Sequence, residues 1–316
     1  MRLQQLRFLC EINRQNLNLS KAAESLHTSQ PGISKQIQLL EEELGVDIFV
    51  RNGKRIVKIT PPGEAIIAIA ERMLHDAENL KSVGQEFNNQ ASGTLTIATT
   101  HTQARYALPP IIKRFTERYP NVKLILRQGN PMQIATLVSS GEADLAIATE
   151  AIELFHELIM LPCYQWNRCI VLPPDHPLLA NPILTLESIA QYPIVTYDFA
   201  FTGRSKINRA FEARGLNPNV VLTAIDSDVI KTYVELGLGI GILANMAFDP
   251  LRDKHLRSID ASHLFEPSTT RVGISRNSYI RGYSYDFIEM FAPHLTQDVV
   301  KSAMKGKSKR TEPFSF

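Results

Sequence analysis

The sequence predicts an α/β protein that begins with an α-helix-rich winged helix-turn-helix, continues through one long helix and ends in a larger part of alternating strands and helices. Three patterns predict this order. Two short helical segments joined by a tight turn lie between residues 19 and 42, one apolar stripe runs from about 62 to 88, and strand-like and helix-like runs alternate from residue 94 onward. With 316 residues, the chain is long enough for more than one domain, each with its own core.

A helix-turn-helix is predicted in residues 19–42. Ser20 is expected to cap its first helix, and Gln30-Pro31-Gly32 opens the second. The apolar residues of the second helix are spaced by four and three, at Ile33, Ile37 and Leu40. Its opposite face carries amide, hydroxyl and lysine side chains without a carboxylate, which suits a surface that reads base edges and neutralises phosphates. Taken alone, the segment is also compatible with an ordinary helical hairpin.

The flanking segments favour DNA binding. A preceding helix has an apolar face made of Leu3, Leu6, Phe8, Leu9 and Ile12, and Leu44-Gly45 ends the third helix. Strand-like runs at 46–49 and 56–59 flank an Asn-Gly pair, which predicts a β-hairpin that acts as a wing on the phosphate backbone. We expect DNA contacts from Ser20, Thr28, Ser29, Gln30, Pro31, Ser34, Lys35 and Gln36 in the helix pair, and from Arg51 and Lys54 in the wing.

The next element is a helix from about 62 to 88. Proline at its first position and Glu64 in its first turn start it, and apolar residues at helical spacing continue it. About 27 residues is long for a globular helix, so its apolar stripe needs a partner. A second copy of the chain is the economical partner, because it also places two recognition helices on one duplex. Residues 88–93 are expected to form a hinge.

Strands and helices alternate in the rest of the chain. The predicted strands are 94–98, 122–127, 145–148, 169–172, 194–196, 220–225 and 240–243, and the helices between them are 108–118, 132–139, 206–214 and 229–236. This alternation favours parallel sheets with helices on both faces. A run at 271–275 and a helix at about 280–291 are expected to return to the first lobe. Crossovers near 161–165 and 267–270 then divide the region into two lobes around a cleft.

Hydroxyl and amide side chains follow the strands that end at this cleft. The first strand leads into Thr99-Thr100-His101-Thr102-Gln103, and Thr149 ends another strand of the same lobe. Thr202 lies on the opposite wall, and Tyr164 and Trp166 lie at the crossover. Such donors beside a helix N-terminus suit a small anion. The alternative, equally supported by spacing alone, is that these threonines only cap helices.

Composition and motifs exclude several classes of protein. The sequence contains no run of about eighteen apolar residues, so we expect no membrane span. It starts with an amphipathic helix instead of a signal peptide. Three cysteines without metal-ligand spacing fit a reducing compartment, and Cys163 and Cys169 are expected to be buried thiols. There is no GxSxG, HExxH, CxxC or glycine-rich phosphate motif, so we expect neither an enzyme nor a metal site. Asp226, Ser227 and Asp228 are expected to cap a helix.

Long stretches of the chain resemble the LysR-type transcriptional regulators. The N-terminal signature of that family is matched by MRLQQLRFL, LSKAAESLHTSQPGISKQIQLLEEELGVDIFVRNGK and ITPPGE. Later segments look like the subgroup that controls sulfur assimilation and the cysteine regulon: TLTIATTHTQARYALP, FAFTGRS, DSDVIKTYVELGLGIGILA and YDFIEMFAPHLT. The resemblance covers the whole chain.

The resemblance implies an activator of cysteine-biosynthesis genes with an effector domain of the type II periplasmic-binding-protein fold. It implies a homodimer or homotetramer in the bacterial cytoplasm that binds promoter DNA and RNA polymerase. It implies no cofactor, only a small anionic effector such as sulfate, thiosulfate or acetylserine. The effector contacts that it implies are Thr100, Thr102, Gln103, Thr149, Tyr164, Trp166 and Thr202, whereas His101 is expected to be structural. The alternatives are a paralogue that regulates taurine or other sulfonate use, and a solute-binding protein for a small anion.

These observations predict four parts. Residues 1–60 form the winged helix-turn-helix and 61–90 the linker helix used for dimerisation. Residues 91–300 form the effector domain, with one lobe at about 91–161 and 268–300 and the other at about 162–267. Residues 301–316, with five basic residues and one acidic residue, form a basic, mobile tail. Effector binding is expected to change the relative position of the lobes, and the linker helices to pass that change to DNA.

Overall fold

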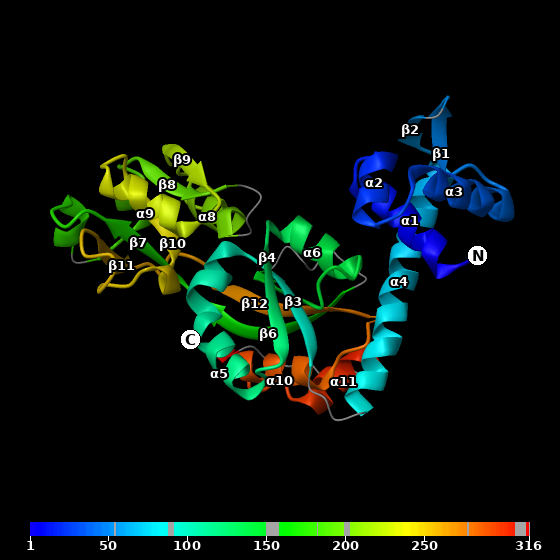
Figure 1. Cartoon of the computed structure of the whole chain (residues 1–316). Helices are drawn as coiled ribbons and strands as arrows, with labels where there is room; N and C mark the ends of the chain where they lie inside the picture. The colour runs from blue at the N-terminus through cyan, green and yellow to red at the C-terminus, as the bar shows by residue number, and fades with distance from the viewer. Residues whose placement is uncertain are drawn as a thin grey trace. The chain divides into compact units, whose positions relative to one another are not determined.

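The computed structural model describes residues 1–53, 55–87, 92–149, 158–181, 183–198, 203–276, 278–306 and 314–315. The chain forms two compact units, Met1–Asn88 and Asn89–Phe316 (Figure 1). The predicted hinge at 88–93 falls largely on residues 88–91, which lie outside the described residues. No helix in the described ranges is both long enough and apolar enough to cross a bilayer.

The first unit is a winged helix-turn-helix followed by a long helix. Its elements are α1 (Leu3–Arg14), α2 (Leu19–Ser25), α3 (Gln30–Leu44), β1 (Phe49–Asn52), β2 (Arg55–Ile59) and α4 (Pro61–Phe87). The predicted apolar residues of α3, at Ile33, Ile37 and Leu40, are fully buried. The first turns of α4 pack on the same core through Ile67 and Ala70. Leu3, predicted to lie on the apolar face of α1, is instead 47% exposed.

The ends of these helices follow local capping chemistry. Ser29 caps α3 by accepting from the backbone N–H of Gly32, and Gly45 ends it with a left-handed φ of 69°. The prediction that Ser20 caps α2 is wrong. Asn16 and Leu17 take positive φ, so the chain turns earlier and Asn18 accepts from the backbone N–H groups of the first turn.

The hairpin forms, but its first strand begins at Phe49 and not at residue 46 as predicted. Residues 46–48 instead lead from the end of α3 to the strand, and Asn52 pairs with Arg55 across the turn. Gly53 takes the left-handed φ of 61° that the turn requires. The start of helix α4 packs closely against residues 46–48. A Cβ at Gly63 would lie 2.2 Å from the Ile48 carbonyl oxygen, so only glycine fits there.

The second unit contains two sheets. One has the strand order β13-β6-β12-β5-β3-β4 and the other β11-β7-β10-β8-β9. The strands of the first are β3 (Gly93–Thr99), β4 (Val122–Gln128), β5 (Leu145–Thr149), β6 (Leu158–Trp166), β12 (Ser268–Ser275) and β13 (Phe314–Ser315), and those of the second are β7 (Arg168–Leu172), β8 (Ile194–Tyr197), β9 (Val220–Ala224), β10 (Ile240–Ala244) and β11 (Arg257–Asp260). We call the first sheet with its helices lobe 1 and the second lobe 2.

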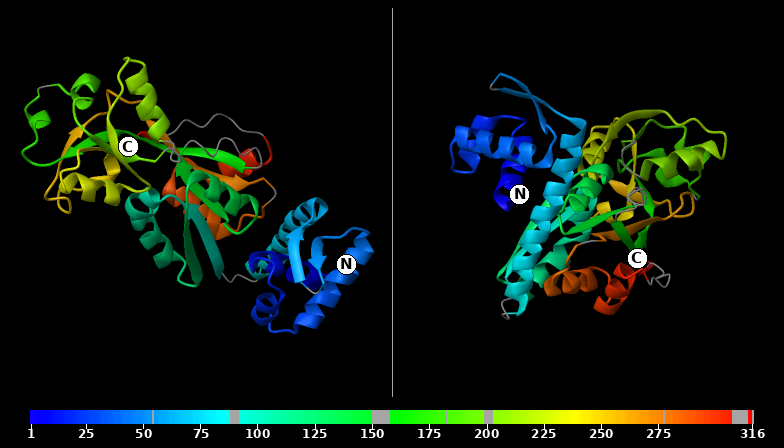
Figure 2. Two further views of the ribbon diagram at one scale, coloured as in Figure 1. Left: turned by 90° about the horizontal axis from the view of Figure 1, so that it is seen from above. Right: turned by 90° about the vertical axis from the view of Figure 1, so that its right-hand side faces the viewer.

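Helices cover both faces of each sheet (Figures 1 and 2). In lobe 1 these are the π-helix η1 (Gln103–Ala107), α5 (Pro109–Arg118), α6 (Pro131–Ser139), α10 (Gly282–Phe291) and α11 (Gln297–Met304); in lobe 2 they are η3 (Pro177–Ala180), α7 (Leu186–Ile189), α8 (Gly203–Glu212), α9 (Ser227–Glu235) and η4 (Asn245–Ala247). Alternate residues of the buried strands pack on opposite faces. Ile97 and Ile147 lie in the core with α5, α10 and α11, whereas Ala98 and Ala148 lie in the core with α6.

The prediction of parallel sheets holds for most of the described strands, but each sheet also contains one antiparallel strand. Strand β12 runs antiparallel to β5 and β6, and β7 runs antiparallel to β10 and β11. Each is the first strand that the chain forms after crossing from one lobe to the other. Parallel neighbouring strands need a long crossover connection, usually a helix. A strand that follows the change of lobe without such a helix can therefore pair antiparallel to its neighbours.

Two further predictions need correction. Residues 161–165 do not form the crossover, since β6 extends to Trp166 and β7 begins at Arg168. The predicted tail at 301–316 starts too early, because its first residues belong to α11 and Phe314 pairs with Tyr164 in β6. Residues 307–313 and 316 lie outside the described part of the chain.

Candidate functional site

The predicted DNA-reading residues lie on the outside of the first unit. Thr28, Ser29, Gln30, Pro31 and Lys35 are exposed, as is Ser20, and Ser34 and Gln36 are half-buried. The Ser20 hydroxyl donates to Oε1 of Gln30 over 3.1 Å, which fixes the direction of the Gln30 amide. Between α2, the start of α3 and the wing lies an open groove of about 540 Å³, to which Gln30, Asn52 and Arg55 contribute.

Arg51 has a structural contact that the sequence did not predict. Its Nη2 lies 2.7 Å from Oε2 of Glu41, a side chain only 6% exposed in α3. The other carboxylate oxygen of Glu41 accepts from the backbone N–H groups of Ile48 and Phe49, at 2.9 and 3.1 Å. Glu41 therefore attaches the wing to the recognition helix. Lys54, the other predicted wing contact, lies outside the described residues.

In the second unit, three of the predicted effector residues meet in one buried network. Gln103, only 1% exposed, donates from Nε2 to the Thr270 hydroxyl over 3.1 Å, and Tyr164 donates to Oε1 of Gln103. The indole N–H of Trp166 donates to the same Thr270 oxygen, also over 3.1 Å. Burial raises the pKa of Tyr164, so its phenol stays neutral. The network consists of uncharged hydroxyl, amide and indole groups.

Thr270 joins this network but was missed by sequence reasoning. It is fully buried, and in the sheet it lies opposite Tyr164 on one side and Thr149 on the other. Thr149, a predicted effector residue, is therefore its neighbour. The Ser-Thr-Thr run at 268–270 was the available sequence signal, but only the strand register brings it to Gln103, 167 residues away.

The remaining predicted effector residues take separate positions. Thr100 is half-buried, and its carbonyl accepts from the N–H of Ala104 at the start of η1. The Thr102 side chain lies near the hydroxyl of Tyr197 in lobe 2, and that hydroxyl lies 2.7 Å from Oγ of Ser227. Thr202 lies outside the described residues, so its predicted place on the opposite wall of the cleft is untested.

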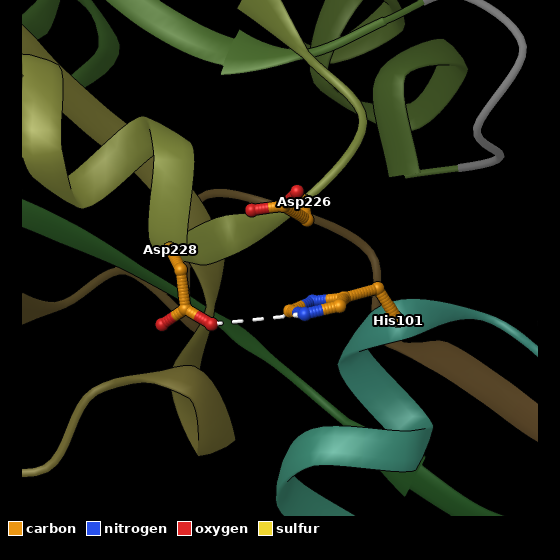
Figure 3. A group of neighbouring side chains, drawn as sticks. All are labelled: His101, Asp226 and Asp228. Atoms are coloured by element: carbon orange, nitrogen blue, oxygen red, sulfur yellow. Dashed lines mark ion pairs between the residues drawn. The ribbon is translucent and has the colours of Figure 1, made fainter. Parts of the chain in front are cut away.

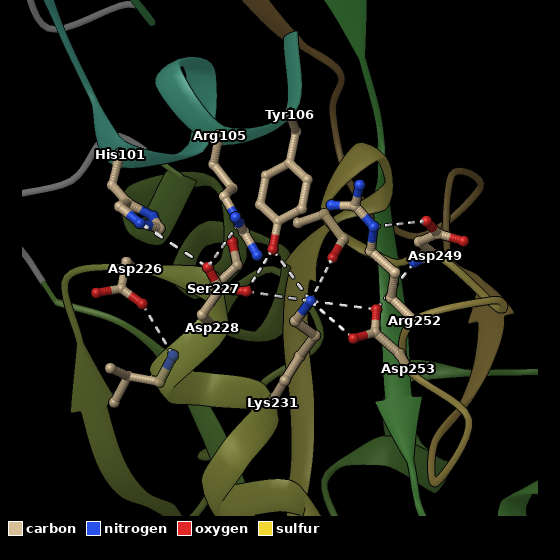
Figure 4. Close-up of polar contacts among 12 residues, drawn as sticks. His101, Arg105, Tyr106, Asp226, Ser227, Asp228, Lys231, Asp249, Arg252 and Asp253 are labelled. Atoms are coloured by element: carbon tan, nitrogen blue, oxygen red, sulfur yellow. Dashed lines mark hydrogen bonds and ion pairs between the residues drawn. The ribbon is translucent and has the colours of Figure 1, made fainter. Parts of the chain in front are cut away.

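A second polar cluster connects the two lobes and was not predicted (Figure 4). From lobe 1, the Tyr106 hydroxyl donates to Oδ1 of Asp228 over 2.6 Å. From lobe 2, Lys231 donates to the Tyr106 oxygen over 3.0 Å and to both carboxylate oxygens of Asp253. Burial opposes the charge on Lys231, but these hydrogen bonds outweigh it and raise the pKa of the ammonium group.

His101, Asp226 and Asp228 lie at the edge of this cluster (Figure 3). Their potential ligand atoms are all within 4.8 Å of one another, and His101 Nε2 lies 3.8 Å from Asp228 Oδ2. Asp226 caps α9 by accepting from the Val229 N–H, as predicted. Asp228 is instead the carboxylate shared by Tyr106 and Lys231, and these contacts lower its pKa although partial burial opposes this. Capping and ion pairing account for both carboxylates without a metal.

The cysteines are the buried thiols that their spacing suggested. Cys163 and Cys169 are at most 1% exposed and neither is in a disulfide. Burial raises the pKa of Cys169 to about 12 and that of Cys163 as well. Both therefore stay protonated and unreactive near neutral pH.

Comparison with known proteins gives matches along the whole chain. The model of the bacterial regulatory helix-turn-helix protein, lysR family, matches residues 3–64, and that of the LysR substrate binding domain matches residues 88–296. The HTH-type transcriptional regulator SsuR of Burkholderia cenocepacia is 56% identical over 305 residues, which cover 96% of this chain and 99% of that protein. CysB of the same organism is 53% identical over 312 residues, covering 99% and 100%. The crystal structure of the cofactor-binding domain of the Cbl transcriptional regulator aligns with a TM-score of 0.65 and 46% identity, over 68% of this chain and 94% of that one.

Proposed function

The chain belongs to the LysR family of transcriptional regulators, in the group that includes SsuR, CysB and Cbl, and we propose that it controls sulfur-acquisition genes in response to a small anion bound in its second unit. Members of this group are sulfur-related DNA-binding regulators and not enzymes. The match to CysB over 99% of the chain includes the helix-turn-helix, which favours a regulator over a solute-binding protein.

The observation that carries the effector proposal is the uncharged donor network of Gln103, Tyr164, Trp166 and Thr270. Such groups, beside the N-terminal end of a helix, bind a small anion without a full positive charge. We propose that the effector is sulfate, thiosulfate or acetylserine, and that Thr100, Thr102, Thr149 and Thr202 contribute further contacts. The similar domain of Cbl is described as cofactor-binding, which is in keeping with a small-molecule site.

Two regulatory roles fit the comparisons equally. The chain is 56% identical to SsuR and 53% identical to CysB, so identity does not favour one. We propose control of sulfate assimilation and cysteine biosynthesis, with sulfonate or taurine use as the second candidate. Deleting the gene and comparing growth on sulfate and on taurine separates them. Loss of growth on sulfate that cysteine restores supports the first role, whereas loss on taurine alone supports the second.

We also propose how the chain acts on DNA. Residues 1–60 bind promoter DNA, 61–90 pair with a second copy, and 91–300 bind the effector between lobe 1 and lobe 2. Two large apolar side chains of α4 are exposed, Ile69 by 47% and Leu80 by 76%, and a second α4 helix is a suitable cover for them. Assembly into a homotetramer in the bacterial cytoplasm, with contact to RNA polymerase, completes the proposal.

A gel-shift titration tests the function as a whole. Full-length protein is mixed with promoter fragments from sulfate-assimilation and sulfonate-use genes, with and without sulfate, thiosulfate or acetylserine. We expect specific retention of at least one fragment and a change in its affinity or mobility with at least one compound. Retention equal to that of a scrambled duplex contradicts the proposal.

A further inference from the structure

The two lobes of the second unit are joined by a compact polar contact between η1 and α9. Tyr106 donates to Oδ1 of Asp228 over 2.6 Å, and the Lys231 ammonium donates to the Tyr106 oxygen over 3.0 Å. The same ammonium lies 3.3 Å from Asp228 Oδ1 and 5.3 Å from the centre of the Tyr106 ring. The three side chains therefore form a closed triangle across the lobe boundary, which we call the clasp (Figure 4).

The lobe 2 side of the clasp is held in place independently of Tyr106. Lys231 is fixed by the Ala247 carbonyl at 2.9 Å and by Asp253 at 3.0 Å, and its side chain is only 10% exposed. From lobe 1, Arg105 and His101 also approach Asp228, but over 3.4 and 3.8 Å and from more exposed positions. Tyr106 thus makes the short interlobe hydrogen bonds of the cluster.

The clasp shares helix η1 with Gln103, one of the predicted effector contacts. Gln103 begins the five-residue π-helix η1 and reaches the Thr270 network, while Tyr106 lies three residues later in the same helix. Thr102, just before η1, lies near Tyr197, and the Tyr197 hydroxyl lies 2.7 Å from Oγ of Ser227 at the start of α9. Single-turn π-helices are frequent at functional sites. A shift of η1 that changes the effector contacts must therefore also move Tyr106 relative to α9.

We propose that Tyr106, Asp228 and Lys231 are positioning residues that hold the two lobes in the arrangement that binds the effector. This inference rests on the proposed effector site. A ligand that needs one arrangement binds with an apparent affinity reduced by the fraction of molecules outside it. Hydrogen bonds to charged partners are strong enough to keep the fraction of molecules outside the binding arrangement small. Removing them therefore weakens effector binding even though these side chains do not contact the effector.

Tyr106→Phe tests the clasp, and Tyr119→Phe is its matched control. Tyr119 is also half-buried and also donates to a carboxylate, that of Asp286, but both of these residues lie in lobe 1. The full-length variants are titrated calorimetrically with sodium sulfate, sodium thiosulfate and acetylserine, each as a separate probe. We expect Tyr106→Phe to raise the Kd of whichever probe binds the wild type by about tenfold, and Tyr119→Phe to leave it within about twofold.

Hydrogen exchange of the ligand-free proteins tests the clasp without any effector. We expect Tyr106→Phe to increase exchange in peptides from both lobes, 103–107 and 227–235, whereas Tyr119→Phe increases it only around 119 and 286. If Tyr106→Phe binds the probes like the wild type, or if its exchange rises in one lobe alone, the clasp proposal is wrong. If no probe binds the wild type, the effector proposal fails, and the exchange comparison alone decides whether the clasp exists.

Discussion

On the recognition helix α3, two exposed side chains are expected to contact DNA in different ways. Lys35 offers a charge to the phosphate backbone, whereas Gln30, directed by Ser20, offers an amide to a base edge. We predict that Lys35→Met weakens binding to promoter and scrambled duplexes alike and lowers the salt dependence of log K by about one unit. Gln30→Ala should instead cost roughly 1–3 kcal/mol on the promoter alone. Anisotropy titrations across a salt series measure both, and equal loss on both duplexes for Gln30→Ala contradicts its assignment.

Glu41 shows how one buried carboxylate links the wing to the recognition helix. It pairs with Arg51 and accepts from two backbone N–H groups, so its removal leaves three partners unsatisfied. We predict that Glu41→Ala lowers the free energy of unfolding by roughly 2–4 kcal/mol. Glu42→Ala, one residue further and exposed, is the control and should cost no more than about 0.5 kcal/mol. Urea unfolding measures both, and equal midpoints would show that the Glu41 contacts contribute nothing.

The sequence predicted which residues belong to one polar site better than it predicted which side chains they contact. The sequence predicted that Gln103, Tyr164 and Trp166 belong to one site, and the structure brings the three side chains into one hydrogen-bonded network. It did not indicate Thr270, which meets them through the register of β12 with β6. Nor did it indicate the clasp, since Tyr106 and Asp228 are 122 residues apart and neither belongs to a recognisable motif.

Among the elements, those with local start and stop signals were predicted closely. Helix α3 begins after Ser29 and ends at Gly45 because the cap residues determine both ends. Helix α4, with proline at its start, begins one residue before the predicted position. The crossover predicted at 161–165 lies within strand β6, which contains Pro162. A bulge between Thr270 and Arg271 faces that proline, so the ladder continues despite the missing N–H donor.

The exposed apolar side chains of α4 make a prediction at the scale of this element. Ile69→Glu places a charge where we propose that a second α4 packs, so the variant should sediment as a smaller species than the wild type. Ile183→Glu is the control, because Ile183 is even more exposed, by 71%, and lies in lobe 2. Sedimentation velocity at micromolar protein distinguishes the species. If Ile69→Glu sediments like the wild type, the contact between copies does not involve this face of α4.

In the second unit, each lobe has a sheet with helices on both faces. The lobes meet through polar contacts and through apolar ones, since Ala244 and Met246 of lobe 2 pack against the core of lobe 1. The uncharged network around Thr270 lies in lobe 1, and the charged clasp lies at the boundary with lobe 2. In our two proposals, the first group recognises the effector and the second controls the relative position of the lobes. The sequence predicted two lobes with a cleft, but it predicted neither the antiparallel strands nor the contacts that hold the lobes together.

The most direct test of the whole account is a calorimetric titration of the full-length protein with sulfate, thiosulfate and acetylserine, repeated on Gln103→Leu and Thr99→Val. Both variants remove a buried polar group from nearby positions, but the Thr99 hydroxyl donates to the Ile147 carbonyl of the adjacent strand instead of to the Thr270 network. We predict that at least one compound binds the wild type, that Gln103→Leu raises its Kd at least about tenfold, and that Thr99→Val leaves it within about twofold. Wild-type affinity in Gln103→Leu, or no binding of any of the three compounds, would contradict the account.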